Sequence, residues 1–90
     1  MKLNKNFILK NIGSEYILIP LGQEAIEIKG LLKTNEVGSD IYKYIEKGYD
    51  VDRIIDAIVS DYGIAWEVAK NDVNEFISNL RKYGVISDEA

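Results

Sequence analysis

The side chains of this chain that could take part in acid–base or metal chemistry are carboxylates, lysines, arginines and tyrosines, because it contains neither histidine nor cysteine. The lack of histidine removes the commonest general base and the imidazole ligands of a typical zinc or iron site. The lack of cysteine excludes a thiolate metal site and a disulfide framework. An enzyme would have to work with the remaining side chains alone, so we predict neither catalysis nor a bound cofactor or metal.

The carboxylates are placed as helix caps and solvated helix surface rather than as a catalytic set. Asp50, Asp52, Asp56 and Asp61 do not follow the Asp-x-Asp-x-Asp-Gly spacing of an EF-hand calcium loop. For Asp72 we expect a structural role, such as a hydrogen bond to a neighbouring loop. The sequence has no paired-carboxylate spacing and no glycine-rich phosphate loop that would favour an enzyme.

Charge is distributed unevenly along the chain, whose net charge is −4. Residues 1–34 carry five lysines and three glutamates, a net charge of +2, whereas residues 35–90 carry six basic and twelve acidic side chains, a net charge of −6. An acidic second half is a poor match for the phosphates of nucleic acid. No apolar run approaches the ~20 residues that cross a bilayer, and the first six residues lack the apolar region of a signal peptide. We therefore expect a cytoplasmic protein that binds neither nucleic acid nor membrane.

Three short strands are predicted before residue 33. Residues 7–10 form a strand candidate that ends in the turn at residues 11–14. Residues 15–20 are apolar on both faces, as in a central strand covered on both sides, and the proline at position 20 ends this strand. Residues 25–32 alternate between apolar and charged side chains, which is typical of a half-buried strand.

Three amphipathic helices are predicted after the turn at Thr34 and Asn35. Either of these two residues can cap the first helix, and Gly48 ends it. Gly38 is a weak helix former in the first turn of this helix, so we predict that the helix packs closely against the sheet there. This order of elements predicts an α+β, winged-helix-like domain in which a three-stranded antiparallel sheet is followed by three helices.

The second and third helices have clear ends. Asp50 caps the second helix and Gly63 ends it. The third helix runs over residues 65–83, with Trp66 as an expected core anchor, and a short apolar tail at residues 85–86 follows it. We find no linker or repeat, and we expect one domain over residues 1–90 with its core at about residues 7–86.

Three stretches of the sequence form a pattern in their order and spacing. They are Gly30-Leu31-Leu32-Lys33-Thr34-Asn35-Glu36-Val37-Gly38 followed by Ile41-Tyr42, then Val51-Asp52-Arg53-Ile54 with Asp61-Tyr62, and finally Asn71-Asp72-Val73 with Phe76-Ile77, Leu80 and Tyr83-Gly84-Val85-Ile86. Together they resemble the small leader-peptide-binding domains of the pyrroloquinoline-quinone biosynthesis protein D family, also called precursor-peptide recognition elements. The chain departs from the family pattern at Ala65, where relatives usually place an acidic helix cap.

This resemblance implies binding rather than catalysis. In such domains the leader segment of a ribosomally synthesised precursor peptide adds as a further strand to the free edge of the third strand. The side chains of the leader then lie in the groove between that strand and the third helix. The family's partner enzymes are often radical S-adenosylmethionine enzymes, so the resemblance implies a chaperone-like domain that presents the leader to a tailoring enzyme of this kind.

The peptide contacts are expected on the third strand and on one flank of the third helix. On the strand they are Ala25, Ile26, Glu27, Ile28, Lys29, Gly30 and Leu31. On the helix they are Lys70, Val73, Asn74, Ile77 and Arg81, of which Lys70, Asn74 and Arg81 form a basic-polar flank suited to an acidic leader. The opposite flank, Asp72 and Tyr83 beside Phe76, could form the groove side instead, and the sequence leaves this choice open. The simpler account of Ile26 and Ile28 is that they pack in the core. The simpler account of Glu27 and Lys29 is that their charges protect the strand edge.

Two other functions are compatible with the same elements. A winged-helix nucleic-acid-binding domain would need a basic recognition helix, but the third helix has as many acidic as basic side chains. An edge-strand dimerisation module would use the same free strand against a second copy of the chain, so a homodimer through that edge is an alternative to peptide binding.

Overall fold

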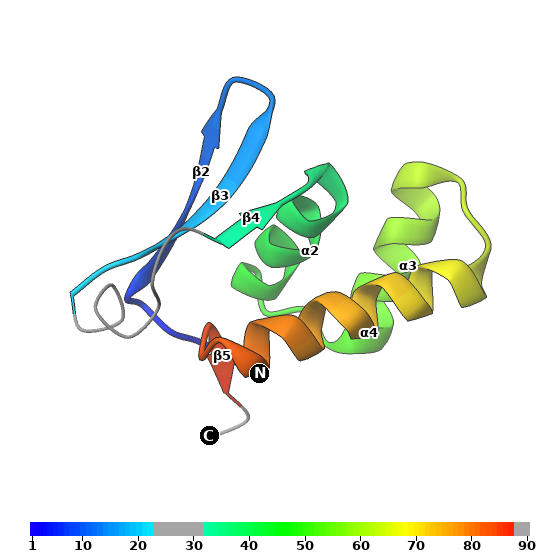
Figure 1. Cartoon of the computed structure of the whole chain (residues 1–90). Helices are drawn as coiled ribbons and strands as arrows, with labels where there is room; N and C mark the ends of the chain where they lie inside the picture. The colour runs from blue at the N-terminus through cyan, green and yellow to red at the C-terminus, as the bar shows by residue number, and fades with distance from the viewer. Residues whose placement is uncertain (23–31, 88–90) are drawn as a thin grey trace.

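The computed structural model describes residues 1–22 and 32–87 (Figure 1). A three-stranded antiparallel sheet in the order β2-β3-β4 is followed by three helices, which confirms the α+β architecture predicted from the sequence. The elements in chain order are β1 (Lys2–Leu3), β2 (Phe7–Ile12), β3 (Glu15–Pro20), β4 (Leu32–Thr34), α2 (Glu36–Glu46), α3 (Val51–Tyr62), α4 (Trp66–Lys82) and β5 (Ile86–Ser87).

The β2–β3 hairpin is longer than the sequence indicated. Asn11 and Ile12 continue β2 and pair with Tyr16 and Glu15, so only two residues form the turn. Gly13 opens this turn at a φ of 64°, a conformation that favours glycine. The predicted four-residue turn was therefore wrong at its start, because pairing across the hairpin extends the strand beyond its apolar part.

β3 lies at the centre of the sheet, as its two apolar faces predicted. Ile17 and Leu18 are consecutive and point to opposite faces, yet both are buried. Leu18 belongs to the main core, which lies between this sheet and the helices. Of the residues predicted for the third strand, only Leu32 lies within the described residues, and the described strand continues from it to Thr34.

A second, two-stranded sheet joins the two ends of the described chain and was not predicted. Lys2 pairs with Ser87 and Leu3 with Ile86. The Asn4 backbone N–H also donates to the Val85 carbonyl at 2.8 Å. A strand of two residues is too short to show an alternation of apolar and polar side chains. The sequence therefore indicated no strand at residues 2–3 and only a short apolar tail at residues 85–86.

Helix ends follow the predicted caps. The Asn35 side chain accepts from the Gly38 N–H at 2.8 Å, which selects Asn35 over Thr34 as the cap of α2. The Asp50 side chain accepts from the Arg53 N–H at 2.9 Å at the start of α3. Ala65 gives α4 no side-chain cap, as expected for an alanine at the position where relatives usually have an acidic cap.

Trp66 is a correction to the predicted core. Its side chain is 42% exposed, although a core anchor was expected at this position. It is the first residue of α4, and the first buried position of the helix, Ala69, comes only one turn later. The Lys70 ammonium instead lies 5.3 Å from the centre of the Trp66 ring, so the indole is covered by a cation at the surface.

Two tyrosine–aspartate hydrogen bonds join α2 to α3. The Tyr44 hydroxyl donates to Asp61 and the Tyr62 hydroxyl donates to Asp40, each at 2.5 Å. The bond to Asp61 is the largest cause that raises the pKa of Tyr44, to about 12. Burial, followed by the bond to Asp40, raises the pKa of Tyr62 as well. Both tyrosines thus hold their protons more tightly in the folded chain than in the unfolded one.

We predict that these two bonds stabilise the fold below pH 10, because the raised pKa values favour the protonated, folded form. The contribution of Tyr44 is then lost as the pH rises from 10 through its raised pKa of about 12. The free energy of unfolding in urea, measured from pH 8 to pH 11.5, should fall less steeply for Tyr44→Phe than for the wild type. Tyr83→Phe is the matched control, since that hydroxyl makes no hydrogen bond to a carboxylate in the described part of the chain. Parallel losses in Tyr44→Phe and the wild type would contradict this account.

The predicted close packing at Gly38 is also observed. A Cβ atom added there would lie 2.0 Å from the Thr34 hydroxyl oxygen and 2.8 Å from the Phe76 ring, both far inside normal contact. Glycine therefore lets the start of α2 touch both β4 and α4.

Gly38→Ala should lower the free energy of unfolding by about 1–3 kcal/mol, the usual cost of overpacking. Helix propensity alone predicts a gain of up to about 1 kcal/mol for the same change. Chemical denaturation of this variant beside Ser60→Ala, at an exposed position of α3, separates the two effects. A stabilised Gly38→Ala would show that the contact with Phe76 relaxes at no cost.

Candidate functional site

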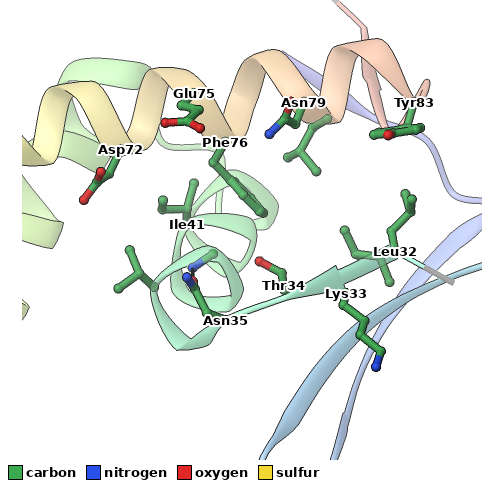
Figure 2. Close-up of a pocket in the computed structure, with 14 residues that line it drawn as sticks. Leu32, Lys33, Thr34, Asn35, Ile41, Asp72, Glu75, Phe76, Asn79 and Tyr83 are labelled. Carbon is green, nitrogen blue, oxygen red and sulfur yellow. Dashed lines mark hydrogen bonds between the residues drawn. The ribbon is translucent and has the colours of Figure 1, made fainter.

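A groove of about 740 Å³ runs between β4 and α4 (Figure 2). β4, β3 and the start of α2 supply one wall and the floor, and α4 supplies the opposite wall. The lining residues are Leu18, Leu32, Lys33, Thr34, Asn35, Val37, Gly38, Ile41, Asp72, Glu75, Phe76, Asn79, Leu80 and Tyr83.

The wall formed by α4 is a single stripe of its surface. Asp72, Phe76, Asn79 and Tyr83 recur every three or four residues, so they lie above one another on one side of the helix. Figure 2 shows the Phe76 ring reaching across from α4 toward Ile41 and Thr34. This ring divides the groove into two ends, one near Asp72 and one near Tyr83.

The other wall carries an open strand edge. β4 is the last strand of its sheet, and on its outer side it pairs with no strand among the described residues. The ladder shows which of its backbone groups face outward. Pro20, paired with Phe7, has no N–H, and Leu21 N–H donates to the Asn6 carbonyl at 2.7 Å, so this pair is one without mutual hydrogen bonds.

Hydrogen-bonded and non-hydrogen-bonded pairs alternate along an antiparallel ladder, so Leu18 and Tyr16 direct their backbone groups toward β4. Leu32 and Thr34, their partners, therefore use their N–H and C=O groups within the sheet. Lys33, between them, directs its N–H and C=O to the open edge. One donor and one acceptor thus face the groove side of β4.

The two ends of the groove differ in polarity. Asp72 and Glu75 lie toward the end that contains Asn35, whereas Tyr83 and Leu32 lie toward the other end (Figure 2). Lys33 also lines the groove, but its ammonium lies 3.8 Å from the Glu15 carboxylate on the outer face of the hairpin. The Asp72 end therefore carries negative charge that no lining cation of the described chain neutralises.

The described residues of the groove present features that suit a bound polypeptide. In the described residues, no group of three or more carboxylates forms a cluster suited to a metal ion. No helix in that part of the chain is long and apolar enough to cross a membrane. The groove offers a backbone donor and acceptor, an apolar floor and a polar wall, which together suit an extended polypeptide.

The predicted site residues fall into three groups. The seven strand residues at positions 25–31 lie outside the described residues. Val73 and Ile77 are 0% and 2% exposed and belong to the core, so their side chains do not line the groove. Lys70, Asn74 and Arg81 are exposed on α4 but are not lining residues. As peptide contacts, these residues stay predictions.

The groove uses the flank of α4 that the sequence left as the alternative. Asp72, Phe76 and Tyr83 line it, and Glu75 and Asn79 join them, although neither of these two was predicted. The spacing from Asp72 to Tyr83 contained the signal for this stripe. It was ambiguous because Val73 and Ile77, one position further along the helix, form an equally regular and more apolar stripe that packs in the core.

Of the comparisons with known proteins, a solved structure shows the fold and a family model shows the family. No curated protein shows significant sequence similarity to the chain. The solved structure of TbiB1 in complex with the TbiA(beta) leader peptide is similar, with a TM-score of 0.79 and 23% identity over 100% of this chain and 99% of that chain. The family model of coenzyme PQQ synthesis protein D (PqqD) matches residues 15–86, which is most of the sequence. The resemblance inferred from the three sequence stretches is therefore confirmed, and the chain belongs to the PqqD family.

Proposed function

We propose that this chain binds the leader segment of a ribosomally synthesised precursor peptide and presents it to a tailoring enzyme. The leader adds as a strand to the open edge of β4 and lies in the groove between β4 and α4. The observation that carries this proposal is the edge itself, because the backbone groups of Lys33 face a groove that α4 closes on the far side.

Strand addition satisfies backbone groups of Lys33 that pair with no other strand among the described residues. The N–H and C=O of Lys33 would pair with one leader residue, and each hydrogen bond contributes about 1 kcal/mol net. An apolar leader side chain buried against Leu32 and Phe76 adds about 2 kcal/mol. These contacts total only about 4 kcal/mol before the cost of ordering the peptide, so a micromolar affinity, which corresponds to about −8 kcal/mol, requires further contacts along the leader.

The TbiB1 complex supports a peptide as the occupant. That protein has the same fold over its whole length and was solved with a leader peptide bound. Membership of the PqqD family points in the same direction. The residues at positions 25–31 remain predicted contacts of the leader, as an extension of the same strand edge.

Presentation to an enzyme follows from what the chain lacks. Without histidine or cysteine it cannot hold an iron–sulfur cluster through the usual ligands or use the commonest general base. We therefore assign the chemistry on the bound peptide to a partner enzyme, and a radical S-adenosylmethionine enzyme is the partner that the family suggests. The chain contributes recognition and position.

The open edge also favours a second function, dimerisation through β4. A symmetric pair of β4 strands would bury the same backbone groups of Lys33 that a leader would use. Sedimentation at several concentrations, with and without peptide, distinguishes the two. A dimer that peptide does not dissociate would place the leader elsewhere.

Lys33→Pro tests strand addition directly. Proline removes one N–H, and at this position the lost donor is the outward one, so the bonds between β3 and β4 are kept. We expect the affinity for synthetic N-terminal segments of the short open reading frames beside the gene to fall at least about fivefold, as loss of one hydrogen bond of about 1 kcal/mol predicts. Fluorescence anisotropy with labelled peptides measures the change.

Two variants serve as controls for this experiment. Lys33→Ala removes the ammonium and its pairing with Glu15 but keeps the N–H, so it should bind almost as the wild type does. Asn11→Pro introduces a proline on the opposite edge of the sheet, at an exposed position of β2 whose N–H also points outward. This variant should bind the peptides normally. Normal binding by a folded Lys33→Pro would refute addition to this edge.

A further inference from the structure

We propose that the groove selects leader segments that carry a basic side chain close to an apolar one. The selecting residues are Asp72 and Glu75, at the end of the groove opposite Tyr83. This inference rests on the proposed function and names the class of peptide that the site would take. The basic-polar flank of α4 had instead indicated an acidic leader.

The sheet geometry determines which leader side chains enter the groove. A leader residue opposite Lys33 would share its face of the sheet and point to the outer side, where Lys33 reaches Glu15. Its two neighbours would point inward, one beside Leu32 and the other beside Thr34, because side chains alternate along a strand. Two inward side chains are thus two residues apart in the leader.

These inward positions face different turns of α4. Alternate residues of a strand are about 6.8 Å apart, close to the rise of about 5.4 Å per helical turn. A leader side chain beside Leu32 would therefore lie against Leu80 and Tyr83, which form an apolar subsite. The next inward side chain, beside Thr34, lies toward Phe76 and Glu75, and a further step reaches Asp72 (Figure 2).

The charges of the lining residues determine which leader side chain is preferred at the second inward position, beside Thr34. Asp72 and Glu75 are exposed carboxylates on the same stripe of α4, one turn apart. Lys33, the single cation among the described lining residues, is directed to Glu15 instead. A lysine or arginine in the leader would neutralise these carboxylates, whereas an aspartate or glutamate would add a third negative charge beside them.

Backbone pairing cannot supply this selectivity, because every residue except proline offers the same N–H and C=O groups. Partly exposed ion pairs each change an affinity by about two- to fivefold. Two carboxylates acting together should therefore favour a basic over a neutral side chain by about five- to tenfold at low salt, and less at high salt.

A displayed library of random 15-residue peptides, selected on the folded chain, tests the preference without a known leader. We expect selected peptides to be enriched in lysine or arginine two or four residues from an apolar residue. The variant Asp72→Asn/Glu75→Gln should lose this enrichment and bind the selected peptides about five- to tenfold more weakly. The matched control Asp56→Asn/Glu67→Gln removes the same charge from exposed positions outside the groove and should keep both.

The outcomes separate this inference from the proposed function. If peptides are selected but show no basic preference, or if the groove variant keeps the preference, charge selection by Asp72 and Glu75 is overturned while peptide binding stands. If a folded sample selects no peptide at all, the proposed function fails and this inference fails with it. Enrichment of acidic residues would instead favour the flank with Lys70 and Arg81.

Discussion

The groove depends on the close approach of Phe76 to Gly38. Only a residue without a Cβ atom lets the ring of α4 reach the first turn of α2, and that contact sets α4 opposite the edge of β4. Asn35 makes the arrangement compact, since it follows β4 directly and caps α2. The strand, the helix start and the opposite helix are thus joined at one point, from which the groove extends in both directions.

Among the described residues, this arrangement leaves the outer edge of β4 without a partner strand, and proteins usually avoid such an edge because it invites aggregation. Helix α4 lies across the groove from that edge, so only a chain that fits between β4 and α4 can reach it. In the proposed binding mode, the outward N–H and C=O of Lys33 would set the register of the peptide, and the side chains of α4 would set its sequence preference. In that mode, backbone recognition and side-chain recognition would come from opposite walls of the same groove.

Much of the fold could be predicted from short-range patterns. The helix caps at Asn35 and Asp50 and the central place of β3 follow from local residue types and periods, which act over a few residues. The β1–β5 pair could not be predicted, because it joins segments at opposite ends of the chain by only two pairs of residues. Trp66 was misjudged because size and apolarity favour burial, whereas its position before the first buried turn of α4 leaves it at the surface. The groove flank was ambiguous for a related reason, since α4 presents one stripe to the core and the adjacent stripe to the groove.

The central claim is that an extended peptide pairs with the edge of β4 opposite the Asp72–Tyr83 stripe of α4. An amide chemical-shift titration of the isotope-labelled chain with a selected peptide tests it most directly. The account predicts the largest shifts at Lys33 and its strand neighbours and along Asp72, Phe76, Asn79 and Tyr83, with slowed hydrogen exchange of the Lys33 amide. Shifts centred on Lys70, Asn74 and Arg81, with the Lys33 amide unchanged, would contradict it.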